Sequence, residues 1–572
     1  MERLVMADTA QEGTKSIIFD IAIHIFLAIV MGVVVAIVAN YFVSFAQLAI
    51  QARNDFTGFS INIAGTDRSL VPIIGMLLAA CLVVVVRRIF GITKWSGPAD
   101  SIFAAQQSKE RLDVRLGIGS TLAALINASG GASVGQYGPL VHFGATVSEI
   151  IVRFSKIELD RDIFIACGVA AAISAGFNAP IAGILFAHEA ILRRFSVGAI
   201  APISVAAIVA SAFNQRFFSS DLSYAVPEVS NELIQLLPLL LVSGIVCSLI
   251  AILYMYAIRK TQSMGANSKY SFNQLLFFSA IVCGAIGTFI PEALGLGLDE
   301  INQIINQEFS LSFLFALLTV KILLTALCLG LGFYGGVFGP ALFVGAATGG
   351  ILAFTTSVFG LPTDMAYVII VASLAAVGSA VIGAPLTVVM IVIELTGSYQ
   401  YGLGALLTVI LCSLFTFRFF GLSYFDRQLM DRSVDLRKGR EFLALSQTLV
   451  SEVKGSDYLS FGTETKPEEI LIAMKEKLCT EAYICDENQT LIGKVTIHSI
   501  TGIENLSEGI DKEPIVIPSS SNLNQARAIA SDFVGESIPV TKEGKLVGAL
   551  TEGDIFTRVL ELEDKIRQHD SE

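Results

Sequence analysis

The sequence predicts an all-α polytopic membrane domain followed by a small C-terminal α/β domain. Hydrophobic residues make up 53% of the 572 residues and the mean hydropathy is +0.69, well above the soluble norm. Long apolar runs follow one another from residue 17 to about residue 420. After residue 440 the chain becomes acidic and alternates short β-type and helical runs, which is typical of a soluble domain.

Several apolar runs are long enough to cross or enter a bilayer, whose hydrocarbon core takes about 20 helical residues. They are Ile21–Ile50, Val71–Val86, Leu233–Ile258, Leu276–Ile290, Leu311–Leu331 and Leu403–Phe420. Three other runs are too short to span alone, and we expect half-membrane helices at Ile163–Ile173, Ala182–Ile191 and Ala384–Leu395. Because Gly and Pro interrupt these segments, they indicate a permeation path, since irregular backbone at membrane depth is tolerated only inside protein or along an aqueous cavity.

The membrane domain is duplicated. Gly135–Ala145 and Gly336–Ala346 share the pattern GxxGPxxxxGA. A second pair follows in the same order, in which an Ala-Pro dipeptide precedes Glu189 and Glu394 by the same interval. Repeats with interrupted helices at matching positions indicate a transporter-type binding site between the halves.

Both GxxGP motifs place Gly and Pro directly before an apolar helical run, so each predicts a helix N-terminus. Such an end presents unpaired backbone N–H groups and the positive end of the helix dipole, which attract anions without a full positive charge. Partial charges suit a permeant anion because they bind it only moderately. The alternative is that Gly and Pro merely allow close helix packing.

Given these motifs, the chain resembles the CLC family of chloride channels and chloride/proton antiporters over nearly its whole length. Gly336–Pro340 looks like the GxFxP signature, and Gly135–Pro139 stands in the place of the GREGP signature. Phe177–Phe186 is similar to the segment before the family's inner glutamates, and Ala384–Glu394 matches its counterpart. The resemblance implies two inverted repeats with half-membrane helices, a C-terminal CBS domain pair, and a homodimer with a separate pore in each subunit.

The resemblance also implies an anion site. A central anion would be held by the backbone N–H groups of Val337 and Phe338, with Gly339 as a second-half external amide. The hydroxyl of Tyr424 would close the inner side, although a Tyr near a membrane interface is also common as a belt residue.

The family's first anion motif, GSGIP, is less well kept, because this chain reads Lys94-Trp-Ser-Gly-Pro98. Ser96 is the candidate hydroxyl ligand. Alignment on Pro98 without a gap instead puts Trp95 at the position that usually determines anion preference. Both registers stay open, and with them the selectivity among anions.

Two departures bear on mechanism, because coupling chloride to protons needs titratable groups, for which the family uses two glutamates. The gating glutamate is replaced by Tyr137, between Gln136 and Gly138, and a phenol with an ordinary pKa of about 10 carries protons poorly at neutral pH. The inner proton-transfer position is Ala190, whereas the adjacent family glutamate is kept as Glu189, which we interpret as structural.

We therefore expect passive, proton-independent chloride flux, with Tyr137 as a steric and hydrogen-bonding gate. A chloride/proton antiporter that uses other proton carriers is the alternative. His188 is a poor candidate for such a carrier, because one helical step turns it by about 100° from Glu189. A second alternative is that the Tyr137 ring only packs against neighbouring helices.

Other function classes are disfavoured. A pI near 5.1 gives no support for nucleic-acid binding. Gly131–Gly135 satisfies the GxSxG pattern of hydrolases, but it interrupts apolar helices and overlaps the repeat. The sequence contains no HExxH, Walker A or paired metal-ligand motif. We expect no enzymatic activity, no catalytic or metal-binding residues and no required cofactor.

We expect an N-terminal cytoplasmic segment, a transmembrane domain in two halves, a linker and a CBS pair. The boundaries are 1–16, 17–425 with halves at about 17–215 and 232–425, 426–443 and 444–572. Basic residues after Phe420 place that end in the cytoplasm by the positive-inside rule, in what we expect to be a bacterial inner (plasma) membrane. The polar N-terminus lacks a cleavage-site pattern, so the first helix should be retained.

The tail repeats one phrase, as Gln489–Thr496 and Gly544–Thr551, which predicts two copies of a small α/β module. In the second copy, Thr551 and Asp554 resemble the T-x-x-D pattern that contacts ribose in nucleotide-binding CBS pairs, whereas Thr496–Ser499 of the first copy lacks the acid. An adenine-nucleotide sensor and a ligand-free dimerising scaffold are the two interpretations.

Overall fold

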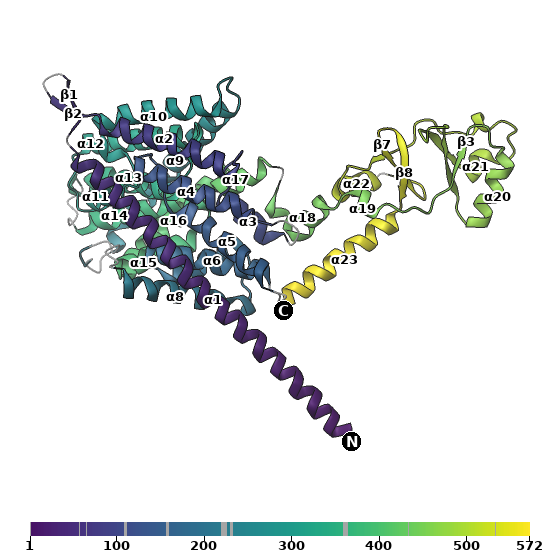
Figure 1. Cartoon of the computed structure of the whole chain (residues 1–572), viewed down its shortest axis with the longest axis horizontal. Coiled ribbons are helices and arrows are strands. Elements are labelled where there is room, and N and C mark those ends of the chain that lie inside the picture. The colour runs from purple at the N-terminus through teal and green to yellow at the C-terminus, as the bar shows by residue number, and fades with distance from the viewer. Residues whose placement is uncertain are drawn as a thin grey trace. The chain divides into compact units, whose positions relative to one another are not determined.

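The computed structural model describes residues 2–56, 58–63, 66–107, 111–155, 160–218, 226–228, 233–358, 364–432, 434–531 and 533–571. The chain divides into two compact units, Met1–Arg432 and Ser433–Glu572. The first unit is helical apart from one short hairpin, and the second carries two small mixed sheets (Figure 1). Residue 232, the predicted start of the second half, lies outside the described residues.

The first half of the helical unit begins with the long helix α1 and the β1–β2 hairpin. Its elements are α1 (Glu2–Asp55), β1 (Ser60–Ile63), β2 (Thr66–Ser69), α2 (Val71–Phe90), α3 (Pro98–Gln106), α4 (Val114–Gly130), α5 (Tyr137–Phe154), α6 (Arg161–Phe177), α7 (Pro180–Phe186), the π-helix η1 (Ala187–Leu192) and α8 (Val197–Phe217). Helix α1 therefore starts well before residue 17 and takes in most of the predicted N-terminal segment.

Among the described residues, the second half repeats the order of the α-helices without the hairpin or the π-helix, and it adds η2 and α17. It consists of α9 (Leu233–Ala266), α10 (Phe272–Phe289), η2 (Pro291–Ala293), α11 (Leu298–Ile305), α12 (Leu311–Gly330), α13 (Phe338–Val358), α14 (Asp364–Ile382), α15 (Pro385–Thr396), α16 (Tyr399–Phe419) and α17 (Tyr424–Met430). Among the described residues, eight helices are long and apolar enough to cross a membrane. Each long run expected from the sequence lies within one of them to within a residue, which confirms the polytopic fold.

Short apolar helices are present at two of the three places that the sequence predicted, whereas Ile163–Ile173 lies inside the 17-residue helix α6. Pro180–Leu192 and Pro385–Thr396 are apolar but fall below the length of a full span. Each begins with Pro at its first position, where the missing N–H costs nothing. The first of them ends as the π-helix η1, a form that is rare and often marks functional sites.

The two halves meet at their repeat motifs. Gly135 and Gly336 form an antiparallel bridge, with N–H to O distances of 2.7 and 2.6 Å. Helix α5 packs on α6 in the first half and α13 packs on α14 in the second, while α7 contacts α15 across the halves. A Cβ atom at Gly138 would lie only 3.0 Å from the Cα atom of Gly336, so a glycine is needed for this close approach.

The second unit is itself double. One sheet has the order β3-β4-β5 and the other β6-β7-β8, and in each the first pair is parallel and the second antiparallel. The strands are β3 (Ser460–Gly462), β4 (Glu481–Cys485), β5 (Leu491–Thr496), β6 (Ile517–Pro518), β7 (Ile538–Lys542) and β8 (Lys545–Leu550). The recurring phrases fall on β5 and β8, which confirms the two copies.

The helices of the second unit cover these sheets. They are η3 (Leu436–Lys438), α18 (Gly439–Gln447), α19 (Val450–Val453), α20 (Pro467–Lys477), α21 (Ile497–Ile500), η4 (Leu506–Glu508), α22 (Leu523–Ala530) and α23 (Glu552–Ser571). Helix α18, which spans the predicted boundary between linker and CBS pair at residue 443, packs on α22 and α23. A buried ion pair joins Lys494 Nζ to Glu481 at 2.7 Å, and Lys494 also donates to the Ser537 carbonyl of the other copy.

Candidate functional site

The N-termini of three helices meet at one place. A Cβ atom on Gly138, in the first turn of α5, would lie 3.0 Å from Gly336 just before α13 and 3.4 Å from Pro98 at the start of α3. The first N–H groups of a helix have no partner within it, and they carry the positive end of its dipole. The meeting point therefore favours negative charge without a buried cation.

A cavity of about 210 Å³ lies beside two of these helix starts, and Pro98 and Gly336 are part of its lining. We call it the Tyr424 cavity. Residues of α3, α9, α12 and α17 line it. The segments directly before α3 and α13 and the residues after α17 complete the lining. Its lining includes the polar side chains of Lys94, Trp95, Asp100, Gln262, Tyr334, Tyr424, Gln428 and Arg432.

The Tyr424 hydroxyl is arranged as a donor. Tyr424 is buried, and its oxygen accepts hydrogen bonds from the side-chain amides of Gln262 at 2.8 Å and Gln428 at 3.3 Å. Because both amides donate, the hydroxyl hydrogen is left for another acceptor. The cavity thus contains a hydroxyl group that can donate to an anion.

Val337 also lines the cavity, directly before α13. Its carbonyl accepts a hydrogen bond from the hydroxyl of buried Tyr254 at 2.8 Å, which fixes the backbone at the start of α13. Phe338 and Gly339 are the next residues, and neither is part of the cavity lining. Of the predicted central-site residues, Val337 and Tyr424 are therefore brought together at the cavity.

The Phe338 ring packs in a separate aromatic cluster. Its partners are Tyr137 at 5.8 Å and Phe177 at 5.7 Å between ring centroids, both edge to face. Tyr137 stacks on Phe177 with centroids 3.7 Å apart and planes 12° apart, and only 4% of Tyr137 is exposed. The Tyr137 ring therefore packs between Phe177 of the first half and Phe338 of the second half.

Gln136, which caps α5 beside Tyr137, is 1% exposed. Its amide nitrogen and oxygen have no hydrogen-bond partner among the residues that the structure describes. A buried amide without partners costs free energy, so the Gln136 side chain is destabilising in this position.

The two registers of the Lys94–Pro98 motif differ in the structure. Trp95 lines the Tyr424 cavity, donates through Nε1 to the Gly332 carbonyl at 3.2 Å and stacks on Tyr334. Ser96 is not part of the lining. Its N–H donates to Ser120 and its carbonyl accepts from the Tyr334 hydroxyl.

Glu189 and Glu394 cap each other's halves. The Glu189 carboxylate accepts from the N–H groups of Leu386 at 3.0 Å and Thr387 at 2.8 Å, at the start of α15. The Glu394 carboxylate accepts from the N–H groups of Ile181 at 2.9 Å and Ala182 at 2.8 Å, at the start of α7. Both carboxylates are thus held at helix N-termini, where negative charge is stabilised.

Ala190 lies in the π-helix and offers no titratable group. Its neighbour His188 is buried, with Nδ1 3.0 Å from the Arg194 carbonyl oxygen and its ring stacked on Phe195. Within the described ranges, no group of three or more His, Cys, Asp or Glu residues is placed to hold a metal ion.

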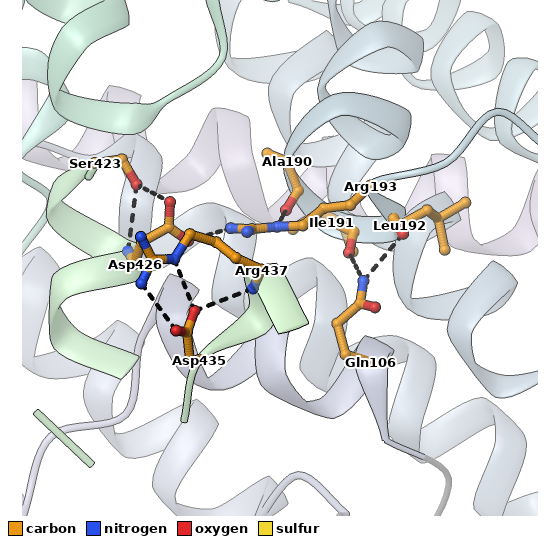
Figure 2. Close-up of polar contacts among 9 residues, drawn as sticks. All are labelled: Gln106, Ala190, Ile191, Leu192, Arg193, Ser423, Asp426, Asp435 and Arg437. Atoms are coloured by element: carbon orange, nitrogen blue, oxygen red, sulfur yellow. Dashed lines mark hydrogen bonds and ion pairs between the residues drawn. The ribbon is translucent and has the colours of Figure 1, made fainter. Parts of the chain in front are cut away.

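Figure 2 shows the polar contacts that join the end of η1 to α3 and α17, two helices that line the Tyr424 cavity. The Gln106 amide, at the end of α3, donates to the carbonyls of Ile191 at 2.6 Å and Leu192 at 3.0 Å. The Arg193 guanidinium pairs with Asp426, two residues after Tyr424 (Figure 2). Helices α3 and α17 are thus both attached to the end of η1.

Sequence reasoning missed the polar lining residues Asp100, Gln262, Gln428 and Arg432. None of them lies in a recognisable motif. Gln262 and its partner Tyr424 are 162 positions apart, so only the folded chain brings them together. The positive charge of Arg432 was visible, but it was interpreted only as a topology signal.

In the second unit, Thr551 and Asp554 form a helix cap. The Asp554 carboxylate accepts from the Thr551 N–H at 2.9 Å and from its hydroxyl at 2.8 Å. Thr496 and Ser499 form the same kind of box in the first copy. The predicted ribose-contacting pair is therefore engaged in capping α23, through one oxygen of the carboxylate.

Interrupted helices, duplicated and joined at their motifs, define a polytopic membrane protein of the inverted-repeat transport type. A profile described as voltage gated chloride channel matches residues 92–416, more than half of the chain, and a CBS domain profile matches residues 506–561. The chain belongs to the voltage gated chloride channel (CLC) family and is an integral membrane protein.

Several known proteins are similar. A ClcB-like chloride channel protein of Ralstonia nicotianae is 29% identical over 360 residues, covering 60% of this chain and 81% of the relative. An H⁺/Cl⁻ exchange transporter ClcA of Vibrio parahaemolyticus is 29% identical over 288 residues, covering 49% of this chain but only 62% of that protein. The crystal structure of a eukaryotic CLC transporter is 18% identical, covers 93% of this chain and 97% of that one, and has a TM-score of 0.61, which shows the shared fold.

Proposed function

We propose that this protein carries chloride or a similar small anion passively across a bilayer, without coupling to protons. The main support for this proposal comes from the two positions where the family resemblance places proton-carrying glutamates. A neutral phenol, Tyr137, occupies the outer position and is buried in an aromatic stack, and Ala190 occupies the inner one. Neither side chain exchanges a proton readily at neutral pH.

The proposed path runs past the three helix N-termini and through the Tyr424 cavity. There the anion meets the Tyr424 hydroxyl and the backbone around Val337, both fixed by neighbouring hydrogen bonds. Such weak, preorganised donors hold an anion moderately, as rapid release requires. Trp95, which lines this cavity, supports the ungapped register for the residue that determines anion preference, with Ser96 as the alternative ligand.

The proposed gate is the Tyr137 ring with its neighbours. In the described structure the ring lies against Phe177 and Phe338, so an anion passes only when the ring turns aside. Gln136, with its unpartnered amide, and Gly138, with no side chain, border the same helix start. The amide of Gly339 is the proposed second-half contribution on the outer side.

Chloride/proton antiport is the second candidate function. The names of relatives such as the Vibrio exchange transporter favour it. It needs another proton carrier, because Glu189 is engaged in capping α15.

Three further features are proposed with this function. The protein acts as a homodimer in a bacterial inner membrane, with the CBS pair in the cytoplasm. No enzymatic activity is proposed. The CBS pair binds an adenine nucleotide at Thr551 and Asp554. In support of this, both hydrogen bonds from Thr551 go to the same oxygen of the Asp554 carboxylate.

The first test is transport itself. Purified protein is reconstituted into chloride-loaded liposomes, and efflux is recorded with a chloride electrode after the potential is clamped. Sustained efflux above that of protein-free liposomes is expected. Efflux no faster than in protein-free liposomes would reject anion transport.

A further inference from the structure

The Tyr424 cavity has an uneven charge. Three charged side chains line it, the cations Lys94 and Arg432 and the anion Asp100. Arg432 Nη1 lies 2.6 Å from Asp100 Oδ1, and the two side chains are 30% and 25% exposed. The pair is therefore accessible from the cavity and is not sealed in the protein core.

Asp100 uses its second oxygen to cap α3. Its Oδ2 accepts a hydrogen bond from the N–H of Gly97, the N-cap residue, at 2.7 Å. The nine-residue helix α3 thus has its anion-attracting end occupied by a carboxylate of the same chain. A carboxylate and a small free anion compete for such a site, since both accept hydrogen bonds from the same N–H groups.

We propose that Asp100 is a built-in competitor of the transported anion and that Arg432 sets how strongly it competes. This inference rests on the proposed anion transport. While the ion pair is intact, Arg432 offsets most of the repulsion between Asp100 and an anion in the cavity. Removing either charge shifts the potential there in the opposite direction to removing the other.

A purely structural role for the Asp100–Arg432 ion pair would lead to a different result. If the pair only fastened the end of α17 to α3, loss of either charge would loosen the same contact, and both changes would weaken anion binding together. Opposite signs therefore separate an electrostatic role from a fastening role.

The experiment compares full-length Asp100→Asn, Arg432→Gln and the double variant with wild type. Chloride binding is measured by calorimetry in detergent, and chloride efflux is measured in liposomes. Asp100→Asn should tighten chloride binding about three- to tenfold, Arg432→Gln should weaken it by a similar factor, and the double variant should return to within about twofold of wild type.

Two controls accompany these variants. Asp113→Asn removes a carboxylate that caps α4 as its N-cap residue and does not line the cavity, and chloride binding should stay at the wild-type level. Arg432→Lys keeps the charge but loses the planar donor geometry, and it should resemble wild type.

The inference is overturned if Asp100→Asn and Arg432→Gln both weaken chloride binding, if Asp113→Asn shifts it as Asp100→Asn does, or if Arg432→Lys behaves like Arg432→Gln. A wild-type protein that neither binds nor releases chloride would reject the proposed function and this inference with it. A wild-type protein that transports chloride while its affinity is insensitive to Asp100 and Arg432 would reject the inference alone.

Discussion

Tyr137 lies at the start of α5, where the family resemblance places a gating glutamate. A carboxylate at this helix start can imitate chloride, whereas a neutral phenol can only block the path or donate one hydrogen bond. The ring stacks on Phe177 at 3.7 Å and meets Phe338 edge-on, so motifs from both halves hold it. This geometry fits both a gating ring and a ring that only packs against its neighbours. Transport measurements on Tyr137 variants distinguish the two roles.

Tyr137→Ala should raise chloride efflux, because removing the ring widens the proposed path. The same change should lower the thermal midpoint, since truncating a buried aromatic ring costs about 3–5 kcal/mol. Tyr137→Phe is the matched control, because it keeps the stack and loses only the hydroxyl. Efflux and stability that fall together in Tyr137→Ala would assign the ring to packing.

Tyr137→Glu should introduce acid-dependent opening. The new carboxylate competes with the anion while ionised and stops competing once protonated, so efflux should rise as the pH falls. Efflux is measured over a series of symmetric pH values, with wild type and Tyr137→Gln as controls. A flat profile for the Glu variant would remove position 137 from the gate.

Tyr424→Phe should weaken chloride binding, because it removes the one hydrogen that Gln262 and Gln428 leave free to donate. The expected loss is roughly 0.5–1.5 kcal/mol, measured by calorimetry. Ser96→Ala should cause a similar loss if Ser96 is the ligand, whereas Trp95→Leu should change the preference among anions if the ungapped register holds. Unchanged chloride affinity in both Tyr424→Phe and Ser96→Ala would move the site elsewhere or favour Trp95.

At the scale of elements, the reciprocal caps tie the two halves together. Each half supplies a glutamate to the start of the other half's short helix, Glu189 to α15 and Glu394 to α7. Glu189→Gln keeps the shape but weakens charge-assisted hydrogen bonds, so it should destabilise the protein by about 1–2 kcal/mol in thermal unfolding. Glu394→Gln should behave alike. A changed pH dependence of efflux in Glu189→Gln alone would instead indicate a proton-transfer role.

Helix starts were the most predictable elements, because their signals are local. Gly and Pro before an apolar run are sufficient to predict the N-termini of α5 and α13, and the duplication predicts that they correspond. The contact between them was not predictable, because the Gly135–Gly336 bridge joins segments 201 residues apart. The π-helical turn at Ala187–Leu192 also has no sequence signature of its own.

The candidate site shows the same division. Val337, Tyr137 and Tyr424 were proposed from the family resemblance, whereas Gln262 and Gln428 lie in no motif. These two residues were noticed only because the fold places their amides on the Tyr424 hydroxyl. The register of Trp95 and Ser96 stayed open in the sequence for a similar reason. Adjacent residues share one motif, but only packing decides which of them faces a cavity.

At the scale of the whole molecule, the CBS pair adds a soluble unit to the membrane domain. Wild-type protein should bind an adenine nucleotide in calorimetry, and Asp554→Ser should weaken that binding, because serine lacks the carboxylate for the ribose hydroxyls. Serine preserves the helix cap, as Ser499 does in the first copy, so the variant should stay folded. Equal nucleotide affinity in the two proteins, or none in wild type, would favour a scaffold.

The central claim is anion flux without proton coupling, and simultaneous recording of chloride and pH tests it most directly. Wild-type protein in liposomes is given an outward chloride gradient, with the membrane potential left unclamped for one record and clamped by a potassium ionophore for another. Chloride efflux should need the ionophore's charge compensation and should drive no proton uptake. A sustained proton movement in fixed ratio to chloride, reversed when the chloride gradient is reversed, would contradict the account.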